Sequence, residues 1–384
     1  MRSWSGRPTE LPSPDVVVIG GGVIGCSIAY YLALAGVRVM VLERDGIASG
    51  ASGVAAGMLA PQVEAFSDDA FFALTLRGRA DHAPLADSLR DDVGLDVEYR
   101  ATGVLRVARD EAERAELQRR WRWQSERGLR AEWLEPADLG RCEPLLAGMT
   151  GRLLAGGLWL PDEGQVRSPR LVQALAAASI KRGALFQEGT AVTGLKVSGE
   201  RIEGVRTSAG VIAAETVVLA AGVWSGELAR AAGVDLPIGP VKGQIMTLGS
   251  LQALPRTIIW SGDCYIAPKA DGQIVLGATE EDGSYDRRPT LAGIGALATA
   301  ALAFLPAVGP YTIEGVWAGL RPALPDRYPV VGRAPGLSNL LLATAHFRNG
   351  VLLGPLTGRA IAQLIGEGVV APDLAPFGPE RLRA

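Results

Sequence analysis

The stretch that decides the fold is Asp15-Val-Val-Val-Ile-Gly-Gly-Gly-Val-Ile-Gly25, followed after a further apolar run by Glu43. The apolar residues before the glycines predict a buried strand. The glycines open a helix that we expect over Val23–Ala35, and the next apolar run predicts a second strand over Val37–Leu42. The order strand, glycine-rich turn, helix, strand and acidic residue is typical of a dinucleotide-binding unit.

Each glycine of the fingerprint has a distinct physical task. Gly20 permits the tight turn, Gly22 lets the backbone approach a pyrophosphate, and Gly25 lets the helix pack closely on the strand. The N-terminus of the helix would face the phosphates. Glu43 would accept a hydrogen bond from a ribose 2′-OH and would repel a 2′-phosphate, which disfavours NADP.

Composition narrows the class of protein. The 384 residues suggest two or three domains, or one large domain with insertions, and a hydrophobic content of 48% is enough for a buried core. A net charge of −3 gives no long-range attraction to nucleic acid or acidic membranes. Cys26, Cys142 and Cys264 lie far apart in the sequence, which argues against disulfides and structural zinc. With only His82 and His346 we expect no metal site.

The chain contains no stretch that predicts a signal peptide or a membrane-spanning helix. Residues 1–14 carry charges and prolines and no apolar centre, so we expect a disordered leader and not a signal peptide. Val16–Val37 changes from strand to helix, and Pro289–Ile313 leaves a helix too short to cross a bilayer. We therefore interpret both stretches as buried structure and expect a cytoplasmic protein.

The rest of the chain alternates between helical and strand-like segments. Ile47–Ala60 is rich in small residues, which suits either a segment lying against a flat ligand or a flexible loop. Expected helices are Asp68–Leu89, Asp110–Arg127, Pro169–Arg182, Leu291–Leu305 (buried on both sides or in a subunit contact) and Gly354–Ile365. Expected strands lie at Val97–Tyr99, Gly103–Val107, Phe186, Val192–Val197, Ile202–Thr207, Val211–Ala213, Thr216–Leu219, Gln244–Leu248, Thr257–Trp260, Tyr265–Pro268, Ile274–Gly277 and Asn339–Ala343.

Pieces that suit nucleotide binding are spread over three stretches of sequence. We therefore expect an α/β protein in which a Rossmann-like FAD-binding domain is interleaved with an antiparallel-sheet α+β substrate domain. The expected FAD-binding domain comprises residues 13–90, 162–238 and 322–370. The expected substrate domain comprises 91–161 and 239–321, with terminal tails at 1–12 and 371–384.

The number of nucleotide-binding motifs in the chain favours FAD as the dinucleotide. There is a single GxGxxG fingerprint and no CxxC pair. An enzyme that passes electrons between FAD and a nicotinamide would normally need a second nucleotide site, and a disulfide reductase would need paired cysteines. One site favours a non-covalently bound FAD whose electrons go to another acceptor.

Later motifs sharpen this interpretation. They are Ala55-Ala-Gly-Met58, Pro240-Val-Lys-Gly-Gln244, Asp263-Cys-Tyr-Ile-Ala-Pro268, Val275-Leu-Gly-Ala-Thr279, Trp317-Ala-Gly-Leu-Arg-Pro322 and His346-Phe-Arg-Asn-Gly-Val-Leu-Leu-Gly-Pro355. With these motifs and the N-terminal fingerprint, the chain closely resembles the glycine oxidases of the D-amino-acid-oxidase-like flavoprotein family, the ThiO type associated with thiamine biosynthesis. The resemblance covers nearly the whole chain.

The resemblance implies three residues at the substrate. Arg321 would hold the substrate carboxylate, for which a planar guanidinium is suited. Tyr265 would bind the same carboxylate through its hydroxyl, and Arg348 would be a second arginine at this end. Lys242 and Gln244 lie in a motif near the family's active site, where a structural role is as well supported as a catalytic one.

The resemblance also implies a set of cofactor contacts. His346 is tempting as a general base, but we interpret it as a structural histidine near the flavin. A helix starting near Gly354 would point its N-terminus at the flavin. The expected cofactor-binding residues are Gly20, Gly22, Val23, Ile24, Gly25, Glu43, Arg44, Ser52, Ala56, Gly57, Met58, Val192, Ala221, Gly222, Trp224, His346, Arg348, Asn349, Gly350, Val351 and Leu352.

The implied activity is oxidation of glycine and related small amines, such as sarcosine and small D-amino acids, with dioxygen as acceptor. Asp263 and Glu280 depart from the family pattern and would add negative charge if they line the pocket. The alternatives are an oxidase or dehydrogenase acting on an N-substituted glycine or another D-amino acid, or a non-catalytic FAD-binding protein that acts as a sensor or a scaffold. The resemblance further implies a homo-oligomer such as a homotetramer.

Overall fold

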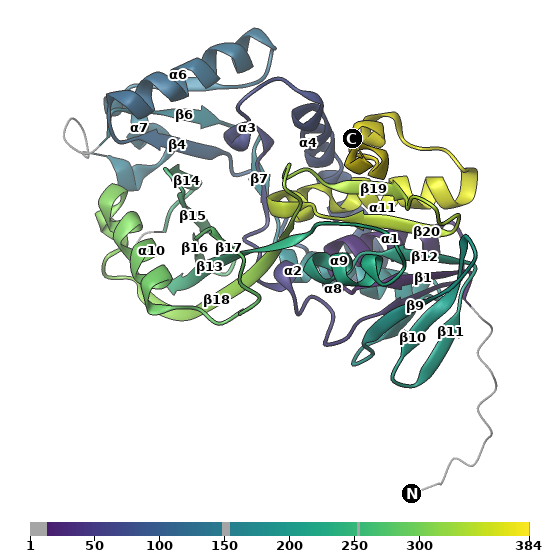
Figure 1. The fold of residues 1–384 in the computed structure, drawn as a ribbon. Helices are drawn as coiled ribbons and strands as arrows, with labels where there is room; N and C mark the ends of the chain where they lie inside the picture. Colours follow the sequence, from purple (N-terminus) through teal and green to yellow (C-terminus); the bar gives the residue numbers. More distant parts are fainter. Residues whose placement is uncertain (1–13, 148–153, 252–253, 384) are drawn as a thin grey trace, which may run out of the picture.

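Two β-sheets lie side by side in the computed structural model, and the chain passes between them four times (Figure 1). The structure describes residues 14–147, 154–251 and 254–383. The expected leader therefore lies almost wholly outside the described residues. The two-sheet α/β architecture agrees with the expected fold class, while the expected domain boundaries stay a prediction.

The first sheet has six strands in the order β19-β20-β12-β1-β2-β8. β1 pairs in parallel with β2 and β12, and only β19 is antiparallel to its neighbour. Its central strands β1, β12 and β20 consist mostly of Val, Ile and Leu and are almost wholly buried, as expected for a sheet covered on both faces. The strands are β1 (Val16–Ile19), β2 (Val39–Leu42), β8 (Leu185–Gln187), β12 (Thr216–Leu219), β19 (Val330–Arg333) and β20 (Leu340–Thr344).

Helices α1 (Val23–Leu34) and α11 (Gly350–Glu367) pack closely beside this sheet (Figure 1). A Cβ atom on Gly358 would lie 2.6–2.8 Å from atoms of Ser27, so only glycine allows the two helices to approach this far. The contact fixes the start of α11 next to the start of α1. Both helix N-termini are thereby brought to the same side of the first sheet.

The second sheet has nine strands, with β18 added beside β13. It is antiparallel except where β14 runs parallel to β4. β13 and β18 form the longest pair, and β18 was not foreseen because Gly315, Gly319 and Pro322 obscure the strand pattern. The strands are β4 (Val104–Ala108), β5 (Glu132–Leu134), β6 (Gly156–Leu160), β13 (Gly239–Gly249), β14 (Ile258–Ser261), β15 (Cys264–Pro268), β16 (Ile274–Gly277), β17 (Glu281–Asp282) and β18 (Thr312–Ala323).

The remaining elements cover or connect the two sheets. β9 (Val192–Ser198), β10 (Arg201–Thr207) and β11 (Gly210–Ala213) form a three-stranded meander, and β3 (Met58–Leu59) pairs with β7 (Gly164–Gln165). The other helices are α2 (Ala51–Val54), α3 (Pro61–Glu64), α4 (Ala70–Ala80), α5 (His82–Val93), α6 (Glu111–Glu126), α7 (Leu139–Cys142), α8 (Ser168–Lys181), α9 (Ser225–Arg230) and α10 (Leu291–Phe304).

Two local expectations were wrong. The expected helix Asp68–Leu89 is two helices, α4 and α5, separated at Asp81, whose carboxylate accepts hydrogen bonds from Arg359 of α11. These bonds come from 278 positions along the chain, so local sequence does not reveal them. The expected strand Val97–Tyr99 does not form, because Glu98 has a φ of 55°, in the left-handed region.

Other differences concern exposed helices and the C-terminal segment. α10 is not buried on both sides, since Leu297, Ala301 and Phe304 face the core while Leu291 is 92% exposed. The segment expected as a C-terminal tail packs on the first sheet's core through Leu374 and Phe377. Within the described residues, no helix is long and apolar enough to cross a membrane.

Candidate functional site: a cofactor and substrate cavity between the sheets

A cavity of about 550 Å³ lies where the two sheets meet, and its wall draws on both. All three residues expected at the substrate line it. Of the expected cofactor residues, Gly25 and Leu352 do not. The others that line it are Gly20, Gly22, Val23, Ile24, Glu43, Arg44, Ser52, Ala56, Gly57, Met58, Val192, Ala221, Gly222, Trp224, His346, Arg348, Asn349, Gly350 and Val351.

The glycine-rich turn has the geometry that its sequence predicted. Gly20 has a φ of 110°, and a Cβ there would lie 2.5 Å from the Ala220 carbonyl oxygen. A Cβ on Gly25 would lie 1.9 Å from the Gly20 oxygen, so Gly25 acts through helix packing and not at the cavity wall. Gly22 caps α1 without a side-chain hydrogen bond, and the Val23 N–H is bound by the Ser52 hydroxyl at 3.0 Å. The result is an N-terminal helix end open to the cavity.

Beyond this turn, the acidic residue Glu43 and the aromatic residue Trp224 line another part of the cavity wall. The Glu43 carboxylate accepts hydrogen bonds from the backbone N–H groups of Gly21 and Asp45, at 2.7 and 2.9 Å. These bonds hold the carboxylate at the end of β2. The Arg44 guanidinium stacks 3.6 Å from the centre of the Trp224 ring. The ribose contact of Glu43 stays a prediction.

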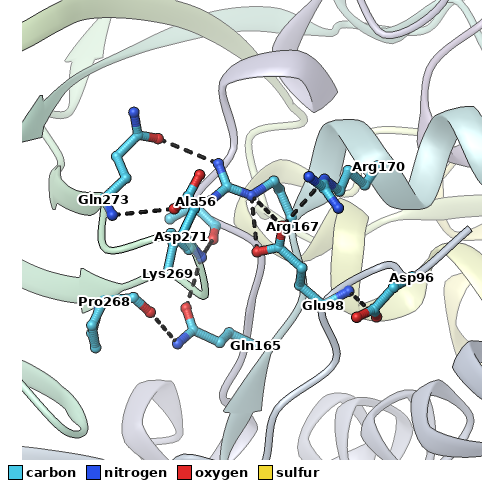
Figure 2. Close-up of polar contacts among 10 residues, drawn as sticks. All are labelled: Ala56, Asp96, Glu98, Gln165, Arg167, Arg170, Pro268, Lys269, Asp271 and Gln273. Carbon is cyan, nitrogen blue, oxygen red and sulfur yellow. Dashed lines mark hydrogen bonds and ion pairs between the residues drawn. The ribbon is translucent and has the colours of Figure 1, made fainter.

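The small-residue segment is held in place from the second sheet, which favours a ligand-lining segment over a flexible loop. The buried Lys269 ammonium group donates to the Ala56 carbonyl oxygen and to Gln165 Oε1, at 2.5 and 2.7 Å (Figure 2). Burial lowers the Lys269 pKa to about 7. Next to it, Arg167 bridges Glu98 and Asp271. This network fixes the backbone on which Ala56 and Gly57 line the cavity.

The start of α11 closes another part of the wall. The helix begins at Gly350 and not near Gly354, because the turn Phe347–Asn349 leads directly into it. The buried His346 ring contacts the Thr357 hydroxyl through Nε2 at 2.9 Å, and Nδ1 has no partner within the described residues. Burial lowers the His346 pKa to about 3. Its imidazole is therefore neutral, which fits a structural histidine.

Arg321 reaches the cavity across a glycine. It lies near the end of β18, and its side chain crosses the neighbouring strand β13 over Gly243, where a Cβ would lie 2.3–2.5 Å from the guanidinium atoms. Its Nη1 donates to the Thr279 carbonyl oxygen at 3.0 Å. Within the described part of the chain, no carboxylate lies within 4.0 Å of this guanidinium. A half-buried, uncompensated cation of this shape suits a ligand carboxylate.

Tyr265 is placed in the same way. It lies on β15, and its ring covers Gly277 of β16, where a Cβ would lie 2.5 Å from the hydroxyl oxygen. Burial raises the Tyr265 pKa to about 12. The hydroxyl therefore keeps its proton and can donate to a ligand in the cavity.

Arg348 has a different electrostatic setting from Arg321. Its Nε lies 3.6 Å from Glu64 Oε2, and its Nη1 lies 3.7 Å from Glu280 Oε2. The negative charge of Glu64 is the main cause of a raised pKa of Arg348. Glu280 also pairs with Arg327 and lies outside the cavity wall.

Several residues fall into different places from those the sequence suggested. Asp263 is exposed and does not line the cavity, like Glu280. Lys242 Nζ donates to the Arg288 carbonyl oxygen at 2.6 Å, and Gln244 bonds Thr290, the residue that caps α10. Lys242 and Gln244 thus have structural contacts away from the cavity.

Sequence reasoning missed two residues that lie beside Arg321 and Arg348, namely Gly243 and Glu64. Gly243 stands in the quoted Pro240–Gln244 motif, but its importance arises from a contact with Arg321 that only the strand pairing creates. Glu64 follows the Ala55–Met58 motif closely, and a carboxylate just beyond a ligand-lining segment is a signal that could have been used. Both line the cavity.

Comparison with known proteins agrees with this geometry. Residues 15–364 match the family model described as FAD dependent oxidoreductase. The chain therefore belongs to the FAD-dependent oxidoreductase family. It is 36% identical to the glycine oxidase of Geobacillus kaustophilus over 96% of this chain and 97% of the relative. The crystal structure of glycine oxidase from that organism superposes with a TM-score of 0.90, at 35% identity, over 95% of this chain and 98% of the other.

A further relative is a fusion. The bifunctional protein ThiO/ThiG of Trichormus variabilis is 37% identical over 96% of this chain, which spans 55% of that longer protein. The match therefore involves one part of the fusion only.

The residues in the cavity fit FAD. The α1 N-terminus and the glycine turn offer backbone N–H groups and a positive helix end for a pyrophosphate. Arg44, Trp224, the start of α11 and Arg321 all line this cavity, and the Arg44 guanidinium stacks on the Trp224 ring. FAD is accordingly the cofactor of this chain. Among the described residues, no group of three or more His, Cys, Asp or Glu could hold a metal ion.

Proposed function

We propose that this protein oxidises glycine and related small amines, including sarcosine and small D-amino acids, and delivers the electrons to dioxygen. The products would be an imine that water converts to glyoxylate and ammonia, or the corresponding carbonyl acid and amine, together with hydrogen peroxide. The observation that carries the proposal is Arg321, a cation without a carboxylate partner in the described structure, in the same cavity as the FAD-binding glycines.

The side chains would act by binding and orientation. Arg321 would grip the substrate carboxylate, while its bond to the Thr279 carbonyl oxygen fixes the direction of the guanidinium. Tyr265 would donate a hydrogen bond from its hydroxyl group to the same carboxylate. When bound, FAD supplies the acceptor for the hydride lost from the substrate α-carbon. The neutral His346 is not needed as a base.

The experiment is anaerobic addition of glycine, sarcosine and D-alanine to the yellow holoenzyme. Loss of the flavin colour, with hydrogen peroxide formed in air, is the expected result. The Arg321→Ala variant should keep FAD and lose most of its affinity for substrate. Absence of bleaching with every amine, or unchanged kinetics in Arg321→Ala, contradicts the proposal.

A second candidate function has the same fold and cofactor but a different substrate or electron acceptor. The enzyme would be an oxidase or dehydrogenase of an N-substituted glycine or another D-amino acid. The charge of the cavity supports these substrates as well as it supports glycine, since each of them has a carboxylate that Arg321 could bind. Comparing peroxide yield with reduction of an artificial dye separates oxidase from dehydrogenase, and the amine panel separates the substrates.

Three further expectations belong to the proposal. Similarity to the ThiO/ThiG fusion supports a role in supplying thiamine thiazole synthesis. A cytoplasmic location agrees with the lack of a membrane-spanning helix in the described residues. Exposed apolar side chains on β18 and α10 support a homo-oligomer, which light scattering of the purified protein would test; they are Leu291, Ile313, Val316 and Trp317.

A further inference from the structure

The substrate end of the cavity contains two arginines with unequal surroundings. Arg321 donates to one backbone carbonyl and has no carboxylate within 4.0 Å among the described residues. Arg348 lies between two carboxylates, Glu64 on the cavity wall and Glu280 outside it. Both arginines line the same cavity.

Among the charged residues of the wall, Arg321, Arg348 and Glu64 are those whose charges act on Tyr265, and together they leave one free positive charge. Arg321 and Arg348 contribute +2 and Glu64 contributes −1, which leaves +1. Glu280 is shared between Arg348 and Arg327, so it further lowers the field of Arg348 without entering the cavity. One free positive charge matches one ligand carboxylate.

We propose that Glu64, supported by Glu280, is a specificity-determining residue that masks Arg348 and thereby restricts the cavity to substrates with a single carboxylate. This inference rests on the proposed function, because it assumes that an amino acid binds by its carboxylate to Arg321. A second carboxylate on the substrate would approach Arg348 and would meet the Glu64 carboxylate beside it. Like charges at such a separation oppose binding.

Glu64 is well placed for this role by its local structure. It is the last residue of the short helix α3, and the preceding carbonyl, that of Val63, accepts hydrogen bonds from Arg106 and Arg120. These bonds fix the end of α3 beside the cavity. The Glu64 side chain is 25% exposed and that of Arg348 is 32% exposed, so a ligand in the cavity can reach both.

The test compares two unreactive acids of similar shape, propionate and succinate, by calorimetric titration of the holoenzyme. The wild type should bind propionate more tightly than succinate. In Glu64→Gln, the affinity for succinate relative to propionate should rise by about tenfold or more, as expected when a charge-assisted hydrogen bond becomes available. Glu280→Gln should shift the ratio in the same direction by a smaller factor.

The controls isolate the cause. Glu126→Gln makes the same chemical change at an exposed position at the end of α6 and should keep the wild-type ratio. Adding Arg348→Met to Glu64→Gln should abolish the gain. A ratio that stays unchanged in Glu64→Gln, or a gain that survives without Arg348, overturns the inference. If Glu64→Gln does not retain FAD, the direction of the ratio in Glu280→Gln decides the question.

Substrate measurements separate this inference from the proposed function. Sarcosine and iminodiacetate differ by one carboxylate, so their relative reduction rates should move in Glu64→Gln as the acid ratio moves. If the wild type oxidises no amine, the proposed function fails. If it oxidises glycine and the variants leave the succinate to propionate ratio unchanged, only the masking role of Glu64 fails.

Discussion

Replacing Gly243 by alanine tests whether Arg321 is held in position by the absence of a side chain on β13. The new Cβ would lie 2.3 Å from Nη2 and 2.5 Å from both Nη1 and the guanidinium carbon, where an ordinary contact needs 3.4–4 Å. The guanidinium must therefore move by roughly 1 Å, and a displacement of this size can lower the rate of a reaction that depends on precise substrate positioning by up to about 100-fold. Because the displaced group is the end of a flexible side chain, we expect the fold to survive.

The expected loss can be stated as a binding constant. Losing one charge-assisted hydrogen bond costs about 1.5–3 kcal/mol, which weakens carboxylate binding by roughly 10- to 150-fold. The assay is anaerobic flavin reduction at increasing glycine concentrations, together with titration by acetate as an unreactive carboxylate. FAD content, measured by absorbance, should equal that of the wild type.

The matched control is Gly239→Ala. Gly239 is on the same strand, and a Cβ there would meet nothing within 4 Å. This variant should bind glycine and acetate like the wild type. The reasoning is refuted if Gly243→Ala binds acetate as tightly as the wild type, or if both variants weaken binding equally.

Three other predictions concern the cofactor and stability. Gly20→Ala should weaken FAD binding at least about tenfold in a fluorescence titration, because the new Cβ would clash with the Ala220 carbonyl, a backbone group that cannot easily move. Gly36→Ala is the control, since Gly36 also has a positive φ but has open space around it, so this variant tests the effect of backbone strain without a clash. Burial lowers the His82 pKa to about 4, below its ordinary 6.5, so the stability that the neutral buried imidazole contributes is present above pH 6.5 and is lost as pH falls towards 4. The loss is about 3 kcal/mol, and in His82→Gln the free energy of unfolding should depend less on pH over this range. FAD added to apoprotein at 100 times its dissociation constant should stabilise the fold by about 3 kcal/mol, seen as a higher Tm, whereas an unchanged Tm would contradict a preformed site.

Local sequence was sufficient where structure depends on neighbours along the chain. The turn Gly20–Gly25 and the strand Thr216–Leu219 lie where their residue patterns indicate, since glycine conformation and β-branched runs are short-range signals. The resemblance of the motifs to a known family predicted that Arg321 and Tyr265 share one cavity, because a family resemblance carries information about the whole fold. Their roles at the substrate stay predictions.

The sequence was insufficient where distant segments meet. Gly243 matters because β13 pairs with β18, and Asp81 ends a helix where Arg359 reaches it from α11. The position of Glu280 beside Arg348, and not in the cavity, likewise depends on how two distant segments meet, the residue just before β17 and the turn Phe347–Asn349. Such contacts are set by tertiary packing, which no pattern within a single element encodes.

The repeated passage of the chain between the two sheets limits how this enzyme can be rebuilt. β4–β6 and β13–β18 belong to one sheet, yet they are separated in the sequence by strands of the other. Grafting a relative's substrate sheet onto this FAD-binding sheet would require two inserted blocks and four junctions. New specificity is therefore more accessible through single side chains on the cavity wall than through exchange of whole modules.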